Sequence, residues 1–361
     1  MKLLIQPGDG VDRLVKGIRK AKKTVEIIIF RFDRSEIERA LTDAVERGVF
    51  VHALIAFTNR GGDENLRKLE KHFLANGITV ARTAGDLVRY HGKMMIVDRK
   101  ELYINGFNFT YLDIDHSRSF GLITRNSKLV AEGVKLFEAD TKRQVYSADN
   151  PKFLISPVNA RKELAQFIKG AKKELLIYDP KISDRAMLRL LEERKKAGVE
   201  LRIIGCVSGD RLPARELKRM RLHTRTIVRD RTQAFLGSQS LRQLELDARR
   251  EIGIIFRDGT ALKNVIRTFE EDWSASESNA QEEQPAEQQT EQVAKKIAKT
   301  LKKKVALNPV AKKVVKTIRS KSNGSDQKDL RDSVKEILKD VVEETAQQAA
   351  EKAANAVAKA G

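Results

Sequence analysis

The residues best suited to chemistry form a short pattern, His-x-(Lys/Arg)-x4-Asp, that occurs twice in the chain. The two copies are His91, Lys93 and Asp98, and His223, Arg225 and Asp230. Imidazole titrates near neutral pH, so one histidine could act as a neutral nucleophile while the other acts as a protonated acid. The cations could hold a phosphoryl group, whose negative charge is spread over its oxygens. One such pattern is a weak signal, whereas two copies at equivalent places in one chain are a strong one.

The residues around the first copy suggest how a strand positions its side chains. Residues 94–97 are apolar and are expected to form a strand, and side chains two positions apart on a strand point the same way. His91 and Lys93 should therefore share one face. A neighbouring strand over 102–104 then leads to a turn that contains Asn108. The alternative, that both histidines are polar residues satisfied locally at strand starts, stays open at this point.

Both copies belong to an internal repeat. Residues 21–30 recur 150 positions later as 171–178, and residues 47–55 recur as 197–205 at the same offset. The motifs themselves are 132 positions apart, so the second copy has a shorter connection before its motif. The expected helices in the two copies are Val11 to Lys20 and Ser35 to Glu46, and Leu164 to Lys169 and Asp184 to Lys196.

Helices that alternate with short apolar strands are typical of an α/β fold with a covered sheet. We expect two pseudo-symmetric halves that meet at a cleft, each a mixed, mostly parallel sheet flanked by helices. A helical or disordered basic tail should follow. The expected domains are residues 1–145 as the first half, 146–273 as the second half, 274–292 as a linker and 293–361 as a low-complexity, partly helical tail.

At this point the sequence resembles the phospholipase D superfamily, whose signature is His-x-Lys-x4-Asp-x6-Gly-(Ser/Gly)-x-Asn. The resemblance covers residues 10–273 and does not cover the tail. It implies that two half-sites meet and hydrolyse or exchange phosphodiesters without a metal or another cofactor. One histidine attacks phosphorus and forms a phosphohistidine. The other protonates the leaving alcohol and then activates water or an acceptor alcohol.

The resemblance also assigns roles residue by residue. The implied catalytic set is His91, His223, Lys93, Asp98, Asp230 and Glu251, and the implied phosphate-binding set is Lys93, Asn108, Arg225 and Ser240. Asp98 and Asp230 would lie behind the site and support the motif. Glu251 would hydrogen-bond a histidine. His91 is taken as the nucleophile because its half is better preserved.

Four positions depart from the family pattern. Arg225 replaces lysine, which keeps the charge but exchanges a compact ammonium for a planar fork. Ser240 replaces asparagine, and Asn105 takes the first glycine position of the turn. Ser119 stands where the first half would carry its acid, so one histidine is expected to lack an orienting carboxylate. These changes fit either an asymmetric catalyst or a binding remnant.

Composition limits the class of protein. Of 361 residues, 41% are hydrophobic and 33% charged, which is typical of a globular chain with a charged surface. No apolar run is long enough to cross a membrane, and no signal peptide is evident, so we expect a cytoplasmic protein that could be peripheral at a membrane. The single cysteine, Cys206, fits a reducing compartment and is expected to be buried.

The net charge of +20 suggests an anionic partner. Residues 276–361 hold 17 basic and 13 acidic residues, so residues 1–275 carry a net charge of +16. The leading hypothesis is a phosphodiesterase acting on a phospholipid or related phosphodiester. The alternatives are transfer to an alcohol, a nuclease of the same superfamily, and a non-catalytic phosphate- or nucleic-acid-binding protein. The basic stretch 293–321 could contact an anionic membrane surface or nucleic acid.

Overall fold

The computed structural model describes residues 1–57, 63–209 and 212–278. The expected tail over 293–361 and most of the expected linker lie outside the described residues. The last helix nevertheless continues to Ser278, past Trp273, where the change in composition predicted that the fold would end.

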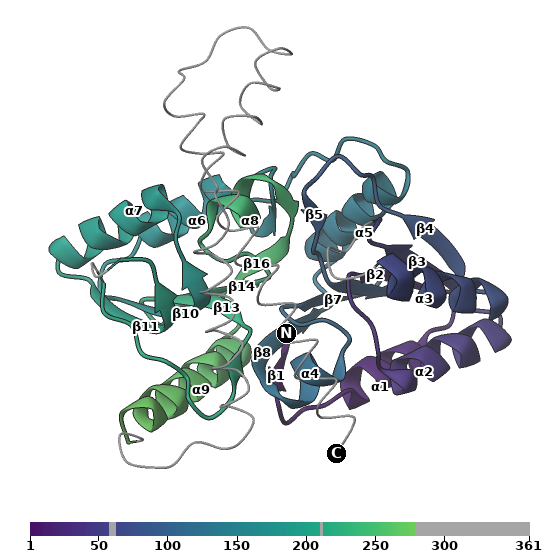
Figure 1. Ribbon diagram of the computed structural model, residues 1–361, viewed down its shortest axis with the longest axis horizontal. Coiled ribbons are helices and arrows are strands. Elements are labelled where there is room, and N and C mark those ends of the chain that lie inside the picture. The colour runs from purple at the N-terminus through teal and green to yellow at the C-terminus, as the bar shows by residue number, and fades with distance from the viewer. Residues whose placement is uncertain (58–62, 210–211, 279–361) are drawn as a thin grey trace, which may run out of the picture. The chain divides into compact units, whose positions relative to one another are not determined.

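The first half begins with strand–helix alternation and ends with a run of strands and two helices (Figure 1). Its elements are β1 (Lys2–Gln6), α1 (Asp12–Lys20), β2 (Thr24–Ile29), α2 (Ser35–Glu46), β3 (Phe50–Ile55), α3 (Asp63–Ala75), β4 (Thr79–Arg82), β5 (Arg89–Tyr90), β6 (Met94–Val97), β7 (Glu101–Asn105), α4 (Tyr111–Asp115), β8 (Ser117–Thr124) and α5 (Ser127–Thr141).

The second half repeats this order with fewer elements. They are β9 (Phe153–Ile155), α6 (Ala160–Lys169), β10 (Glu174–Ile182), α7 (Arg185–Lys196), β11 (Glu200–Val207), β12 (Arg221–Leu222), β13 (Arg225–Arg229), β14 (Gln233–Gly237), α8 (Gln243–Asp247), β15 (Arg249–Arg250), β16 (Ile252–Phe256) and α9 (Gly259–Ser278). The helix predicted to start at Asp184 begins one residue later, because the Asp184 side chain caps it by accepting from the backbone N–H groups of Ala186 and Met187.

Each half contains one mixed sheet, which confirms the α/β class and the two-half arrangement. The strand orders are β1-β8-β7-β6-β2-β3-β4 and β11-β10-β13-β14-β16-β9. The expectation that the sheets are mostly parallel was wrong. Along these two orders only the pairs β2–β3, β3–β4 and β10–β11 are parallel. For two of the antiparallel pairs the reason is local: β6–β7 and β13–β14 are joined by short turns, and a short turn permits only an antiparallel pair.

Helices cover both faces of the first sheet. Leu102 and Tyr103 are neighbours on β7, so their side chains point to opposite faces. A Cβ atom added at Gly17 of α1 would clash with the Tyr103 hydroxyl, whereas one added at Gly133 of α5 would lie 2.9 Å from a Leu102 methyl group. The two helices therefore lie on opposite faces, and each approaches the sheet closely at a glycine.

The two halves share a hydrophobic core within one compact unit. Side chains of the first half, such as Phe120 of β8, pack in the same cluster as Tyr178 of β10 and Phe269 of α9. Ring contacts connect them directly, with centroid distances of 5.7 Å between Phe120 and Tyr178 and 4.9 Å between Tyr178 and Phe269. The strand-bearing parts of the two halves are thus held in a fixed relation to each other.

Two other sequence expectations concern the surface. Cys206 is exposed rather than buried, because it lies on β11, the edge strand of the second sheet. Within the described residues, we find no helix with the length and apolarity needed to span a bilayer.

The motif aspartates close tight turns in both halves. Asp98 accepts hydrogen bonds from the backbone N–H groups of Lys22, Lys23 and Thr24 at 2.7 to 3.0 Å. Asp230 repeats this arrangement with residues 172–174 at 2.7 to 3.1 Å. Both aspartates have a positive φ, of 53° and 51°, in the left-handed region that aspartate tolerates better than most residues. Their role in the structure is to anchor the start of β2 and of β10.

Replacing Asp98 with alanine is expected to lower the free energy of unfolding by about 2 kcal/mol, because three backbone donors lose their acceptor and alanine is strained at this φ. Urea denaturation measures the change. Asp98→Asn is the matched control: it keeps an acceptor and tolerates the backbone, so it should lose less than half as much. Equal losses in both variants would contradict the anchoring role.

Candidate active site

His91 lies at the ends of two interior strands of the first sheet, β2 and β6. Because β2 and β6 are antiparallel, with Ile28 opposite Met94, the C-terminal end of β2 meets the N-terminal end of β6. His91 and Lys93 immediately precede β6. Phe30 immediately follows β2, and its ring packs edge-on against the His91 ring at a centroid distance of 4.7 Å. The sheet thus places the imidazole against the apolar ring of Phe30.

Each histidine segment is hydrogen-bonded to the opposite half of the chain. β5 pairs in parallel with β15, and the His91 N–H donates to the carbonyl of Arg250 at 2.8 Å. In the same way β12 pairs with β8, and the His223 N–H donates to the carbonyl of Arg118 at 3.0 Å. Arg118 and Arg250 are 132 positions apart, the same separation as the two motifs, so they are equivalent residues of the two halves. The two hydrogen bonds are therefore reciprocal: each half accepts the hydrogen bond from the histidine of the other.

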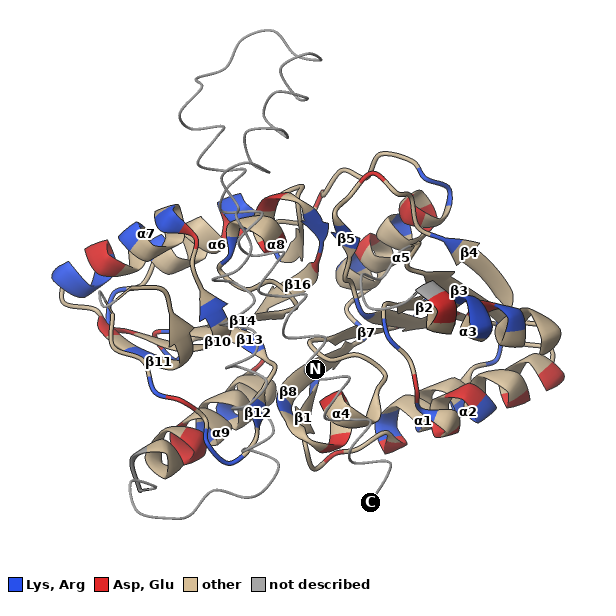
Figure 2. Ribbon diagram, in the orientation of Figure 1, with Lys and Arg blue, Asp and Glu red and all other residues tan. Residues whose placement is uncertain are grey.

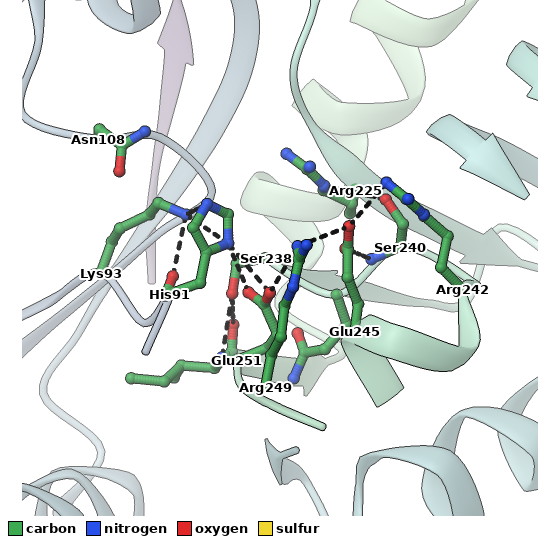
Figure 3. Close-up of polar contacts among 12 residues, drawn as sticks. His91, Lys93, Asn108, Arg225, Ser238, Ser240, Arg242, Glu245, Arg249 and Glu251 are labelled. Atoms are coloured by element: carbon green, nitrogen blue, oxygen red, sulfur yellow. Dashed lines mark hydrogen bonds and ion pairs between the residues drawn. The ribbon is translucent and has the colours of Figure 1, made fainter. Parts of the chain in front are cut away.

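His91 sits between an acid and a cation (Figure 3). Its Nδ1 lies 2.8 Å from Oε2 of Glu251, a residue of the second half. The Lys93 ammonium lies 2.9 Å from Nε2 of the same ring and also donates to the His91 carbonyl at 3.0 Å. The Lys93 ammonium is also 3.0 Å from Nδ1, so it contacts both ring nitrogens. The sequence-predicted residues His91, Lys93 and Glu251 are therefore brought together.

Burial dominates the electrostatics of this group. It lowers the pKa of His91 well below its usual value, and the charges of Lys93, Arg249, Arg225 and Arg89 add to that effect. Burial likewise lowers the pKa of Lys93 to about 7 and raises the pKa of Glu251 to about 7. At neutral pH the His91 imidazole is consequently neutral, as a nitrogen nucleophile has to be.

The cation of the second motif repeats one contact of the first. An Arg225 Nη1–H donates to the His223 carbonyl at 2.6 Å, just as Lys93 donates to that of His91. Arg225 Nε also donates to the Ser240 hydroxyl at 3.2 Å (Figure 3). Glu245 accepts from the Ser240 N–H at 2.7 Å. Arg225, which is longer than lysine, therefore reaches Ser240, which is shorter than the asparagine of the family pattern.

The carboxylate next to His223 belongs to Asp113, a residue that was not among the sequence-predicted site residues. Its Oδ2 lies 3.6 Å from His223 Nδ1 and accepts from the backbone N–H and the side-chain amide of Asn108 at 2.8 and 2.7 Å. A repeat-level signal exists in the sequence: Asp113 and Glu245 each follow the phosphate-binding position of their half by five residues. The pattern Thr110-x-x-Asp113 also resembles an ordinary helix capping box, so the sequence alone explains the acid by helix capping and does not point to a site residue.

The two motifs act on each other electrostatically. Arg225 of the second motif is among the charges that lower the pKa of His91, and Lys93 of the first is among those that lower the pKa of His223. The paired strands β5 and β15 contain Arg89, Arg249 and Arg250, and Figure 2 shows blue at β5. Asp98 and Asp230, by contrast, lie at the turns that close the far ends of β6 and β13 and contact backbone there.

No group of three or more His, Cys, Asp or Glu side chains among the described residues is arranged to bind a metal ion. The polar groups of the site are two imidazoles, cations, neutral donors and the carboxylates of Asp113, Glu245 and Glu251. The cations and neutral donors among them can bind an anion.

Part of the chain is similar in sequence to known proteins. Residues 14–141 match the family model described as "Cardiolipin synthase, PLD-like domain". Over 135 residues the chain is 29% identical to mitochondrial cardiolipin hydrolase of Danio rerio. That match covers 35% of this chain and 56% of the relative, so the chain spans about half the length of the curated relative it matches.

Two solved structures share the fold over most of this chain. Polyphosphate kinase from Porphyromonas gingivalis has a TM-score of 0.64 at 18% identity, covering 75% of this chain and 50% of that one. Phosphatidylserine synthase from Haemophilus influenzae has a TM-score of 0.56 at 12% identity, covering 72% of this chain and 83% of that one. These likenesses concern the fold alone.

Proposed function

Because the chain belongs to the phospholipase D superfamily, we propose that it hydrolyses a phospholipid or related phosphodiester through a phosphohistidine intermediate, without a metal ion. The observation that supports this most directly is the contact of Glu251 and Lys93 with the His91 ring. A neutral imidazole lies between Glu251 and the Lys93 ammonium, and the second motif is close enough for its charge to act on the same ring.

In the proposed first step, His91 attacks phosphorus. A proton on Nδ1, donated to Glu251, places the lone pair on Nε2. The Lys93 ammonium, which contacts Nε2 in this structure, has to turn to the phosphoryl oxygens before the N–P bond forms. The bond from phosphorus to the alcohol oxygen breaks, and His223 gives that oxygen a proton. Lys93, Asn108 and Arg225, with Ser240, would hold the non-bridging oxygens, whose charge grows in the transition state.

In the second step the roles reverse. His223, now neutral, takes a proton from water, and the resulting oxygen attacks phosphorus. The N–P bond breaks and the His91 lone pair returns, so the enzyme is restored with one water consumed. Glu251 keeps the His91 ring oriented in both steps, because its hydrogen bond is made to the nitrogen that does not react.

The function is tested with purified protein, a chromogenic bis-phosphodiester and labelled phosphatidylcholine, each with and without chelator. Turnover that is insensitive to chelator supports the proposal, whereas turnover abolished by chelator rejects its metal-free part. Release of a free alcohol indicates hydrolysis, and exchange into an added alcohol indicates transfer. Cleavage of an oligonucleotide in preference to both substrates would instead favour a nuclease.

The proposed roles fix the pH dependence of kcat/KM. His91 has to be neutral and His223 protonated, and burial lowers the pKa of both rings well below 6.5. The protonated fraction of His223 falls as the pH rises through its lowered pKa, and the neutral fraction of His91 falls as the pH drops through its own. We expect a bell with its optimum below pH 6.5. An optimum above pH 8, measured over pH 4.5 to 9, would contradict these roles.

A further inference from the structure

The first half lacks the acid that corresponds to Glu251. Ser119 occupies that position, is fully buried, and has no hydrogen-bond partner for its hydroxyl among the described residues. His223 Nδ1 also has no hydrogen-bond partner there. His223 itself is only 5% exposed, so solvent has little access to satisfy this nitrogen. The histidine of the second motif thus needs a partner from another element.

Asp113 is the carboxylate that can be this partner, and it is held firmly. It is 2% exposed, and its Oδ1 accepts from Arg221 Nη1 at 2.8 Å while its Oδ2 binds both nitrogens of Asn108. Although burial alone would raise the pKa of Asp113, His223 and Arg221 hold it well below its usual range. The carboxylate is therefore ionised, and its Oδ2 lies 3.6 Å from His223 Nδ1.

We propose that Asp113 is the positioning residue of His223, replacing the carboxylate missing at Ser119 by supplying one from α4 of the opposite half. This inference rests on the proposed function for the role of His223 but not for the contact itself. In this role Asp113 Oδ2 faces Nδ1 of His223 at 3.6 Å and favours the proton on that nitrogen, which leaves Nε2 to give a proton to the alcohol and later to take one from water. Asp113 keeps its charge in both steps.

The counterpart of Asp113 in the second half does not serve its histidine in this way. Glu245 accepts from the Ser240 N–H and lies 3.4 Å from Arg249, and the carboxylate that contacts His91 is Glu251. Each histidine therefore has one carboxylate from the opposite half, but the two carboxylates come from different repeat positions. Asp113 differs further in binding the Asn108 amide, so one carboxylate orients both a phosphate-binding donor and the acid.

The charges around His223 determine what removal of Asp113 should do. Burial lowers its pKa most, Asp113 raises it, and Arg221, Arg225 and Lys93 lower it further. Asp113→Asn keeps an acceptor oxygen for Nδ1–H but removes the charge that favours the imidazolium. Asp113→Ala removes both. The two variants therefore separate orientation of the ring from stabilisation of its charge.

The orientation is tested by the histidine tautomer, which long-range 1H–15N correlation reads at neutral pH without substrate. In the wild type, His223 should carry its proton on Nδ1. In Asp113→Ala the population should shift to the Nε2–H form, and in Asp113→Asn it should stay on Nδ1. Asp115→Asn, on the same helix, is the control and should change nothing. A wild-type Nε2–H tautomer, or an unchanged tautomer in Asp113→Ala, overturns the proposal.

The charge effect is tested by the pH dependence of kcat for a substrate with an alkyl leaving group. The pKa that governs the loss of kcat at high pH should fall by about one pH unit or more in Asp113→Asn. At pH values above that pKa, kcat should therefore be lower by about tenfold or more than in the wild type. Superimposable limbs would reject the role. If the wild-type protein turns over no phosphodiester, the proposed function fails, and the tautomer still decides the contact of Asp113 with His223.

Discussion

Replacing His91 with alanine is expected to reduce turnover of a chromogenic phosphodiester by about 10⁴-fold or more. The variant lacks the proposed nucleophile, and loss of a nucleophile typically removes nearly all of the chemical advantage beyond binding. The measurement is kcat under saturating substrate. His72→Ala provides a matched control, because His72 is a surface residue of α3 that pairs with Glu38. Retention of more than about one hundredth of wild-type kcat would contradict nucleophilic attack by His91.

The same prediction has a direct chemical readout. Rapid quenching of the wild-type reaction, followed by mass spectrometry under conditions that spare the acid-labile N–P bond, should find the substrate's phosphoryl group on His91. The His91→Ala variant should yield no modified histidine. If that variant accumulated the group on His223, the two histidines would have their roles exchanged.

The His223→Ala variant should depend strongly on the leaving group. With an alkyl leaving group, as in phosphatidylcholine, kcat should fall by about 10²- to 10⁴-fold, because the alkoxide then leaves without a proton. With an activated aryl leaving group, which needs no proton, the first step should survive. The second step still lacks its base, so product should appear in a burst of one equivalent per site and then slow.

Pre-steady-state absorbance measures this burst, and quenching during the slow phase should find the His91 adduct accumulated. The same fold-loss for both leaving groups would show that His223 does not act as the proton donor. A steady rate without a burst would show that it is not needed as the base for the second step.

The repeat made much of the fold predictable from sequence. A second copy at a constant offset carries its own helix and strand pattern, and α2 runs from Ser35 to Glu46 as expected. Strand direction was less accessible, because an apolar run such as residues 94–97 has the same composition in a parallel or an antiparallel pair. The turn at Asp98 decides the direction of β6 and β7, and its positive φ is a feature of the backbone that the residue type only permits.

The candidate site was predictable where a contact follows from spacing within one motif. His91 and Lys93 are two residues apart, and their side chains meet as expected. The pairing of Asp113 with His223 joins residues in different halves, and no local pattern encodes it. Glu251 was found through its position in the family pattern, whereas Asp113 stands at a position for which that pattern predicts no acid.

The backbone exchange between the halves has a consequence for how the candidate site can specialise. When two identical subunits build such a site, every substitution appears on both sides of the bound phosphorus. Here a single polypeptide carries both sides, so lysine can face arginine, asparagine can face serine, and each imidazole can keep a differently placed acid. The pairs β5–β15 and β12–β8 hold the two halves in register. Under the proposed mechanism, one ring can then be adapted to bond formation and the other to proton delivery.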